Sequence, residues 1–210
     1  MSITIRRLRA EDLGPVAKLH RESFPSFFLS ELGERFLREF YRGFLTPDAT
    51  TAVAVAEDGR VVGAVVGHTQ PQGFFKKLLL RRWYAFAFAS LSLVLRRPSI
   101  LPRLVRAVTY RGNNDGIERR GALLSSICVD PQYSGDGIGG KLLESFTSQL
   151  VDRGCESAYL STDAVDNDRV NAFYRNAGWA LENPYTTPEG RRMNCYVWHK
   201  GQTLIKDSDR

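Results

Sequence analysis

The chain has 210 residues, of which 43% are hydrophobic and 25% charged, with 18 Gly and 9 Pro. This composition is typical of a globular protein with a hydrophobic core, and it excludes collagen-like, low-complexity and largely disordered chains. Three cysteines are too few and too scattered for a disulfide framework or a four-cysteine zinc site. The first residues lack the apolar segment of a secretory signal, so we expect a cytoplasmic protein with a single domain over residues 1–210.

The positive charge of the chain is concentrated in one segment. Lys and Arg number 29 and Asp and Glu 23, which gives a net charge of +6. Between Gly59 and Asn114 no residue is acidic and ten are basic, namely Arg60, Lys76, Lys77, Arg81, Arg82, Arg96, Arg97, Arg103, Arg106 and Arg111. Without that segment, 19 basic and 23 acidic residues leave a net charge of −4. A partner attracted by charge is therefore expected to meet this segment.

The first third of the chain is expected to form a strand, two helices and a hairpin. Alternating apolar and polar residues predict a strand over residues 3–8, and helical spacing predicts helices over residues 10–24 and from residue 30 onward. Ser30 is the expected N-cap of the second helix, and Pro47 its end. Residues 50–67 predict two strands joined by Asp58-Gly59, which is a strong hairpin signal.

Residues 72–112 interrupt this pattern with apolar, aromatic and basic side chains. The uninterrupted apolar run from Trp83 to Leu95 has 13 residues, fewer than the roughly 20 that cross a bilayer. We expect one or two inserted helices that cover the core or a substrate cleft. The alternative is that residues 73–97 form an interfacial helix that makes a peripheral contact with a membrane. Arginines among aromatic residues are also a weak nucleic-acid signal, but no nucleic acid is expected as a partner.

The second half of the chain alternates strands and helices. The pattern predicts a strand over residues 122–129, a helix over 137–153 that ends at Gly154, and a strand over 157–164. A helix capped by Asp166 or Asn167 follows through Arg175, and the last strands come after Gly178 and over residues 193–200. The predicted fold class is α/β (α+β), a mixed, mostly antiparallel central sheet flanked by helices, with a helical insertion ahead of residue 122.

The loop between the strand at 122–129 and the next helix is dense in glycine. Four of the six residues 135–140 are Gly, more than a tight turn alone requires. Backbone N–H groups and the positive end of the helix dipole then face one point. This arrangement predicts a site for a phosphate or diphosphate.

Two nucleotide-binding motifs compete for the same residues. Gly135 to Lys141 fits G-x-x-x-x-G-K, but Leu142 stands where a P-loop needs Ser or Thr to hold magnesium, which argues against an NTPase. Glycines 135, 137 and 140 fit the dinucleotide fingerprint, with Asp163 as the ribose-binding acid. That fingerprint requires its first glycine directly after the strand, whereas residues 130–134 separate the strand from Gly135 here. A dinucleotide-binding protein remains the weaker alternative.

A third interpretation uses a larger part of the sequence. The stretch V-D-P-x-Y-x-G-x-G-I-G-x-x-L-L from Val129, followed by Asn167 to Trp179 with its Tyr174 and Gly178, resembles the GCN5-related N-acetyltransferase (GNAT) superfamily. The family's motifs are R/Q-x-x-G-x-G/A and N-x-x-A-x-x-x-Y-x-x-x-G-F, and the resemblance covers about residues 120–180. This chain departs from them at three positions: it has Ser134 for Arg or Gln, Val170 for Ala, and Trp179 for Phe.

The resemblance implies a GNAT-like fold that binds acetyl-CoA as co-substrate. The strand that ends with Ile127, Cys128 and Val129 would diverge from its neighbour and bond the pantetheine arm through its backbone. Asn167 would bond the pantetheine amide or thioester region. The diphosphate would be held by the loop residues Ser134, Gly135, Asp136, Gly137, Ile138, Gly139 and Gly140. The loss of an Arg or Gln at position 134 implies that backbone donors carry more of that binding.

Tyr174 is the catalytic residue that the resemblance implies, and it would also contact the cofactor. A phenol with a pKa near 10 lies close enough to a thiol, at about 8.5, to protonate a departing CoA thiolate. An amine must also lose a proton before it attacks, and the resemblance does not assign that base. The candidates for the base are Glu22, His68, Glu118 and Asp163.

The expected function is direct transfer of an acetyl group from acetyl-CoA to a primary amine of a small molecule, such as an amino sugar or sugar nucleotide. An acyl-CoA-binding module without catalytic activity, docked on a membrane, is the alternative. No metal site is expected, because His20, His68 and His199 lack the spacing of ligands. The chain is expected to be a monomer or a homodimer.

Overall fold

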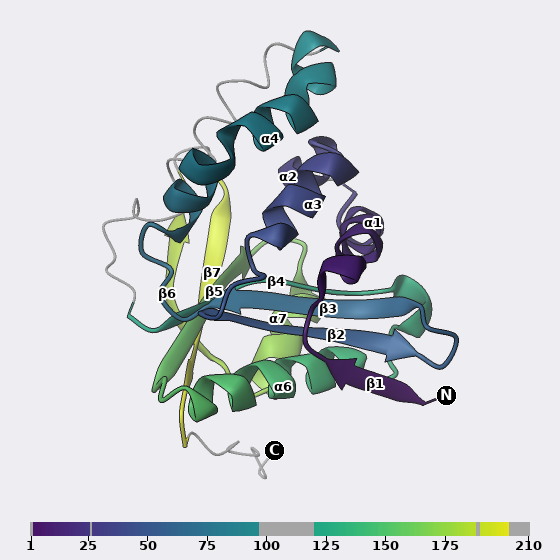
Figure 1. Cartoon of the computed structure of the whole chain (residues 1–210). Coiled ribbons are helices and arrows are strands. Elements are labelled where there is room, and N and C mark those ends of the chain that lie inside the picture. The colour runs from purple at the N-terminus through teal and green to yellow at the C-terminus, as the bar shows by residue number, and fades with distance from the viewer. Residues whose placement is uncertain (1, 26, 97–119, 188–189, 202–210) are drawn as a thin grey trace.

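The computed structural model describes residues 2–25, 27–96, 120–187 and 190–201, with the backbone alone for residues 90–96 (Figure 1). Within these ranges the elements follow the predicted order closely. The second part of the expected insertion, residues 97–112, and the candidate base Glu118 lie outside the described residues.

A seven-stranded sheet forms the centre of the described structure, with the strand order β1-β2-β3-β4-β5-β7-β6. Only the β4–β5 pairing is parallel among its recorded pairs, so the predicted mixed, mostly antiparallel sheet is confirmed. The strands are β1 (Ile3–Arg6), β2 (Ala49–Ala56), β3 (Val61–His68), β4 (Ala122–Val129), β5 (Ser157–Asp163), β6 (Ala180–Thr186) and β7 (Arg192–His199). This topology is not a doubly wound parallel sheet, which removes the support for the dinucleotide-binding alternative.

The predicted hairpin joins β2 to β3. The Ala56 N–H donates to the Arg60 carbonyl at 2.9 Å, and Gly59 adopts a φ of +82°, which favours glycine. The Asp58 carboxylate accepts from the Arg60 N–H at 3.0 Å and so closes the turn. Asp58-Gly59 therefore forms the turn that its sequence predicts.

Helices cover both faces of the sheet, as predicted (Figure 1). The 3-10 turn η1 (Ala10–Asp12) leads into α1 (Leu13–Ser23), and α2 (Phe28–Glu31), α3 (Glu34–Arg42) and α4 (Phe74–Arg96) lie on the same face. The other face carries α6 (Ile138–Asp152) and α7 (Asp168–Asn176), with the short turn η3 (Pro131–Tyr133) before α6. No helix in the described part of the chain combines the length and the apolarity that crossing a bilayer requires.

The helix expected from Ser30 is divided in two, so the assignment of Ser30 as its N-cap was wrong. Ser30 is buried inside α2, and α3 begins after Gly33, whose φ is +87° and which is its N-cap. Only glycine adopts such a φ at low cost, and it interrupts the helix there. The helix α3 also ends at Arg42, before Pro47.

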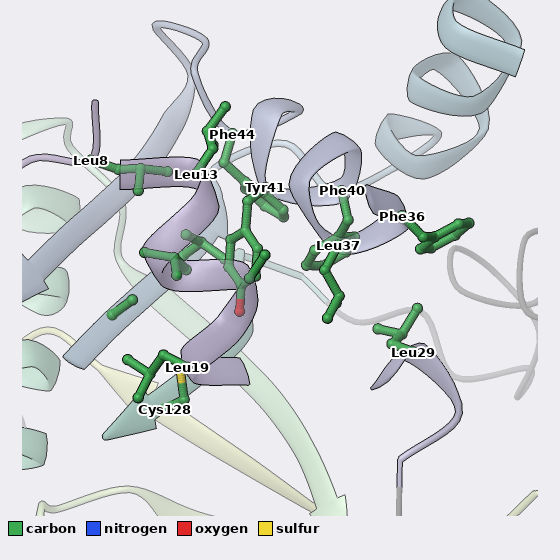
Figure 2. Packing of buried hydrophobic residues seen from close by; sticks show 14 of the residues in the cluster. Leu8, Leu13, Leu19, Leu29, Phe36, Leu37, Phe40, Tyr41, Phe44 and Cys128 are labelled. Carbon is green, nitrogen blue, oxygen red and sulfur yellow. The ribbon is translucent and has the colours of Figure 1, made fainter. Parts of the chain in front are cut away.

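The apolar stripe of α3 is buried against α1 and the sheet nonetheless. Leu37, Phe40 and Tyr41 of α3 share one buried cluster with Leu13 and Leu19 of α1 and Cys128 of β4. Figure 2 shows Tyr41 beside α1, with Leu19 and Cys128 below it. Burial raises the pKa of the Cys128 thiol to about 12. Cys128 is therefore an unreactive core residue, as expected from its place in the strand.

A buried ion pair fixes the first strand to the first helix. Arg6 donates to both carboxylate oxygens of Asp12, at 2.7 and 2.8 Å, and the Arg9 N–H donates to Asp12 at 2.8 Å. Burial by itself acts to raise the pKa of Asp12, but these hydrogen bonds outweigh it and hold that pKa below its usual value. The ionised carboxylate therefore contributes to stability.

Asp12→Asn is expected to lower the free energy of unfolding at pH 7 by about 2 kcal/mol, because Arg6 and the Arg9 N–H lose a charged acceptor. A group with a lowered pKa stabilises the fold above its unfolded pKa, about 3.9, and that contribution disappears as the pH falls through the folded value. Urea unfolding at pH 7 and at pH 3 measures both effects. Glu11→Gln is the matched control, because Glu11 is exposed and lies 4.0 Å from the same Arg6. An equal loss in both variants would contradict the assignment.

Candidate functional site

The sheet opens between its two central strands. β4 and β5 pair only at Ala122↔Ala158 and Leu123↔Tyr159. Beyond this point β4 stays paired with β3 as far as Val129, and β5 stays paired with β7 as far as Asp163. The part of β4 that includes Ile127, Cys128 and Val129 therefore has no strand partner on the β5 side. The backbone groups of Ile127 and Val129 point to this open side, whereas those of Cys128 point to β3, as does the Asp130 N–H that donates to Val62. An extended ligand can add to such an edge.

The glycine loop and the N-terminus of α6 follow directly after this free edge. Gly137 is the N-cap of α6 and has a φ of +74°, and Gly135 has a φ of +101°. Two N–H groups of the loop are used internally: Ser134 donates to Pro131 at 3.2 Å and Asp136 donates to Tyr133 at 3.3 Å. These two residues therefore cannot offer their N–H groups to a ligand without breaking a turn.

The other five amides of the predicted loop are open. Among the described residues, no recorded hydrogen bond uses the N–H of Gly135, Gly137, Ile138, Gly139 or Gly140. A Cβ placed on Gly135, Gly137 or Gly140 would find nothing within 4 Å, so the backbone there is uncovered. Unpaired amides at the positive end of a 15-residue helix provide a binding site for an anion.

Gly139 brings the two predicted motifs into contact. A Cβ at Gly139 would lie 3.3 Å from Cε2 and 3.4 Å from Cζ of Phe173 on α7. Absence of a side chain thus lets the first turn of α6 pack on the Phe173 ring. The helix that carries Asn167 and Tyr174 is in this way held beside the glycine loop.

Arg169 is a residue of this site that the sequence reasoning missed. Its guanidinium extends from the first turn of α7 and donates to the Ser134 hydroxyl. Arg169 is exposed, and no carboxylate of the described residues is recorded as its partner. The sequence did offer one indication of it. Ser134 replaces the family's usual Arg or Gln, and a phosphate-binding loop without that side chain is expected to use a cation from elsewhere in the chain.

Asn167, the N-cap of α7, and Asn171 within it fasten the N-terminus of this helix to β5. The Asn167 side-chain amide donates to the Thr162 hydroxyl at 2.8 Å and to the Asp163 carbonyl at 3.0 Å. Asn171 is buried and donates to the same Asp163 carbonyl at 3.1 Å, while its oxygen accepts from Asn194 at 2.9 Å. Both N–H donors of Asn167 are therefore engaged, and its oxygen is the group left to accept a hydrogen bond from a ligand.

Tyr174 lies in an aromatic cluster on the α6 side of the sheet. Its side chain is only 5% exposed, and its ring centroid lies 5.2 Å from that of Phe173, 5.5 Å from that of Tyr196 and 6.2 Å from that of Trp179. Burial raises the pKa of the Tyr174 phenol well above its ordinary value, and Tyr196 adds to the shift. The phenol therefore keeps its proton at neutral pH and can donate it or share it in a hydrogen bond.

A hollow of about 440 Å³ lies on the opposite face of the sheet, between α1 and the segment that contains α2. Its lining residues are Lys18, Arg21, Glu22, Pro25, Ser30, Glu31 and Glu34. The Ser23 hydroxyl, next to this hollow in sequence, donates to the Val129 carbonyl at 3.3 Å. The end of α1 thus lies at the end of β4, and Glu22 is the candidate base nearest to that point in the chain. Glu22 has an exposed ion pair with Lys18 at 3.9 Å, which is longer than a hydrogen bond.

The remaining described candidates for the base have structural roles. The Nδ1 of His68 accepts from the Gln70 N–H at 3.0 Å, its ring lies 4.3 Å from that of Phe74, and burial lowers its pKa. His68 also pairs with Leu123, at the opposite end of β4 from the glycine loop. Asp163 forms a bidentate ion pair with Arg191, at 2.7 and 2.8 Å. Neither group is free to take a proton from an amine.

Comparison with known proteins places most of the chain in one family. Residues 14–179 match the model of the acetyltransferase (GNAT) family. A curated protein of Prochlorococcus marinus, described as an uncharacterized N-acetyltransferase ycf52-like, is 32% identical over 78 residues. That match spans 37% of this chain and 37% of the curated relative.

Solved structures of acetyltransferases share the fold over nearly the whole chain. The ribosomal-protein-S18-alanine N-acetyltransferase of Escherichia coli has a TM-score of 0.58 and 15% identity, with 100% of this chain and 99% of that chain covered. A polyamine N-acetyltransferase of Drosophila melanogaster has a TM-score of 0.57, 20% identity, and coverage of 94% and 100%. The PaiA N-acetyltransferase of Thermoplasma acidophilum, solved with coenzyme A, has a TM-score of 0.55, 17% identity, and coverage of 94% and 100%.

Proposed function

Because the chain belongs to the acetyltransferase (GNAT) family, we propose that it transfers the acetyl group of acetyl-CoA directly to a primary amine of a small molecule. Acetyl-CoA is the acyl donor of this family, and it supplies an acetyl group activated as a thioester. The single observation that supports the proposal most is the set of five unpaired amides at the start of α6, next to the unpaired edge of β4. A diphosphate joined to an extended amide-bearing arm matches these two features together.

In this proposal, different residues bind different parts of acetyl-CoA. The amides of Gly135, Gly137, Ile138, Gly139 and Gly140 hold the diphosphate. The backbone of Ile127 and Val129 bonds the pantetheine arm, whereas that of Cys128, predicted with them, faces β3. Asn167 accepts from a pantetheine amide through its oxygen, because its N–H donors are taken by Thr162 and Asp163. Ser134 and Asp136 contribute side chains or loop shape, since their own amides are used internally.

We propose separate groups for the two proton transfers of the reaction. Tyr174 protonates the thiolate that leaves, a role supported by its place in the second motif. Glu22 takes the proton of the amine, directly or through water, because it lines the hollow at the end of α1. When the amine attacks, the C–N bond forms and the C–S bond breaks, so the amine loses one proton and the thiolate gains one.

The proposed acceptor is an amino sugar, free or as a sugar nucleotide. The hollow near Glu22 is lined by three carboxylates and by Lys18 and Arg21, which pair with Glu22 at 3.9 Å and with Glu34 at 2.7 Å. Such a mixture of acceptors and cationic donors can bind sugar hydroxyls and an ammonium group.

An assay of thiol release tests this function. Acetyl-CoA is offered with a panel of amino sugars, sugar nucleotides, polyamines and peptide N-termini, and thiol is followed with time. We expect release above the blank with at least one amine, and most with an amino sugar. Binding of acetyl-CoA by calorimetry without release from any amine would instead identify a binding module. Absence of both would refute the proposal.

Arg169 is proposed to supply the cation that Ser134 does not. Arg169→Gln should weaken CoA binding by about 10–100-fold, since charge-assisted bonds to phosphate are worth roughly 1.5–3 kcal/mol. Pantetheine lacks the diphosphate, so its affinity should not change, which separates phosphate binding from a general disturbance of α7. Isothermal titration with the two ligands measures both values.

A compensating variant provides the control. Arg169→Gln combined with Ser134→Arg places a guanidinium back at the family's usual position, and it should recover much of the lost CoA affinity. Equal CoA affinity in wild type and Arg169→Gln, or an equal loss for pantetheine, would contradict the role of Arg169 while leaving the proposed function intact.

A further inference from the structure

One face of α4 carries large apolar side chains that no other part of the described structure covers. Leu80 and Trp83 are each 67% exposed, Tyr84 is 58% exposed and Phe88 is 70% exposed. Their spacing of three, one and four residues places them on one side of a helix, although the backbone bends at Arg82. In Figure 1, α4 lies against α3 and extends past it, away from the sheet.

The opposite face of α4 fixes the helix to the rest of the protein. Phe86 is buried with its ring centroid 4.9 Å from that of Phe36, and Phe75 is stacked at 6.3 Å on Phe40. Arg82 donates to Glu39 on α3 at 2.8 Å through Nε and forms an ion pair at 2.7 Å through Nη2. The exposed face is therefore held outward by packing on α3, and its orientation does not depend on the exposed side chains themselves.

The same exposed surface is basic. Lys76, Lys77 and Arg81 are exposed beside the apolar residues, and no carboxylate of the described residues is recorded as an ion-pair partner for them. The sequence between Gly59 and Asn114 contains no acidic residue at all. This surface, which we call the α4 face, consists of Lys76, Lys77, Leu80, Arg81, Trp83, Tyr84 and Phe88.

We propose that the α4 face docks the protein on an anionic lipid surface. Trp and Tyr are favoured at the boundary between headgroups and acyl chains, because each has an apolar ring and a polar edge. Lys and Arg beside them gain about 1 kcal/mol each near an anionic leaflet, and their alkyl stems can lie along the apolar region. A helix of this kind lies in the interface plane and does not span the bilayer.

Charge argues against a second copy of the chain as the occupant. In a two-fold symmetric dimer the same face would meet itself, and three cations would oppose three cations with no acid on the face to pair with them. An anionic lipid surface attracts the cations of the α4 face. It also has no fixed shape, so it can accommodate the irregular row of exposed aromatic side chains. Docking is independent of the acetyl transfer proposed above, because neither the glycine loop nor the hollow belongs to α4.

Vesicle co-sedimentation tests the docking directly. The full chain is mixed with vesicles of phosphatidylcholine alone or with one quarter phosphatidylglycerol, at 50 and 500 mM salt. We expect binding to the anionic vesicles at low salt, and at least about a tenfold weaker binding to neutral vesicles or at high salt. Trp83→Ser with Phe88→Ser, and separately Lys76→Gln with Lys77→Gln and Arg81→Gln, should each weaken binding about tenfold or more.

Matched controls keep the result interpretable. Val151→Ser with Leu181→Ser removes exposed apolar side chains far from α4 in sequence, and it should not change vesicle binding. The α4 variants alter exposed side chains, so thermal unfolding and CoA affinity without vesicles should stay as in wild type. Wild type that ignores anionic vesicles, or α4 variants that bind as well as wild type, would overturn the proposal. Dimerisation in light scattering that Trp83→Ser with Phe88→Ser abolishes, with no vesicle binding, would assign the face to self-association instead.

Discussion

Gly140→Glu is expected to weaken acetyl-CoA binding by at least about 100-fold, because a carboxylate would stand beside a bound diphosphate and like charges in contact cost several kcal/mol. Gly140 is the third residue of α6, and a Cβ there meets nothing within 4 Å. Side chains in a first helical turn lean toward the N-terminus, which places the carboxylate over the open amides. Glu is also favoured at this helix position, so α6 itself should not be destabilised.

Gly140→Gln is the control for this experiment, because it has nearly the same shape as Glu and no charge. Calorimetric titration of both variants with acetyl-CoA, together with their thermal unfolding, separates charge from bulk. We expect Gln to retain binding within about tenfold and Glu to lose it, at equal or higher thermal stability for Glu. Similar affinities for the two variants would contradict the placement of the diphosphate.

Tyr174→Phe is expected to lower kcat by about 100-fold or more while leaving acetyl-CoA affinity nearly unchanged, since general acid catalysis contributes roughly that factor. Phe keeps the ring that packs on Phe173, Trp179 and Tyr196, so the variant should unfold at the temperature of wild type. Thiol release under saturating substrates measures kcat, and calorimetry measures the affinity. A kcat equal to that of wild type would remove Tyr174 from the mechanism.

The pH dependence follows from the buried phenol. Because burial raises the pKa of Tyr174, the protonated form that donates is retained as the pH rises past its ordinary value near 10. No loss of kcat from ionisation of Tyr174 is therefore expected up to pH 10. A decline of wild-type kcat below pH 10 that is absent from the residual activity of Tyr174→Phe would contradict this expectation.

The sequence predicted most strands and helices because their signals are local. The hairpin at Asp58-Gly59 and the helix that ends before Gly154 depend on residues a few positions apart, and both are confirmed. Ser30 was misassigned because a plausible cap was weighed without the stronger effect of Gly33 three residues later. Hydrophobic spacing does not show where one glycine divides a helix.

The candidate site was predicted only where its parts are contiguous in the chain. The glycine loop could be located from its sequence. Which of its amides are free to bind a ligand could not, because that depends on hydrogen bonds formed in the folded loop, such as the one from the Ser134 N–H to the Pro131 carbonyl. Arg169 reaches Ser134 across 35 positions, and no periodicity indicates that contact. The exposure of Trp83 and Phe88 likewise depends on how α4 packs against α3.

Amide chemical shifts of the labelled protein, recorded with and without CoA, test the central claim most directly. Gly135, Gly137, Ile138, Gly139 and Gly140 are predicted to shift strongly when CoA is added and much less when pantetheine is added, because the diphosphate accepts from their N–H groups. Ser134 and Asp136, whose N–H groups are already bonded, should shift less. CoA that binds without moving the five open amides would contradict the account.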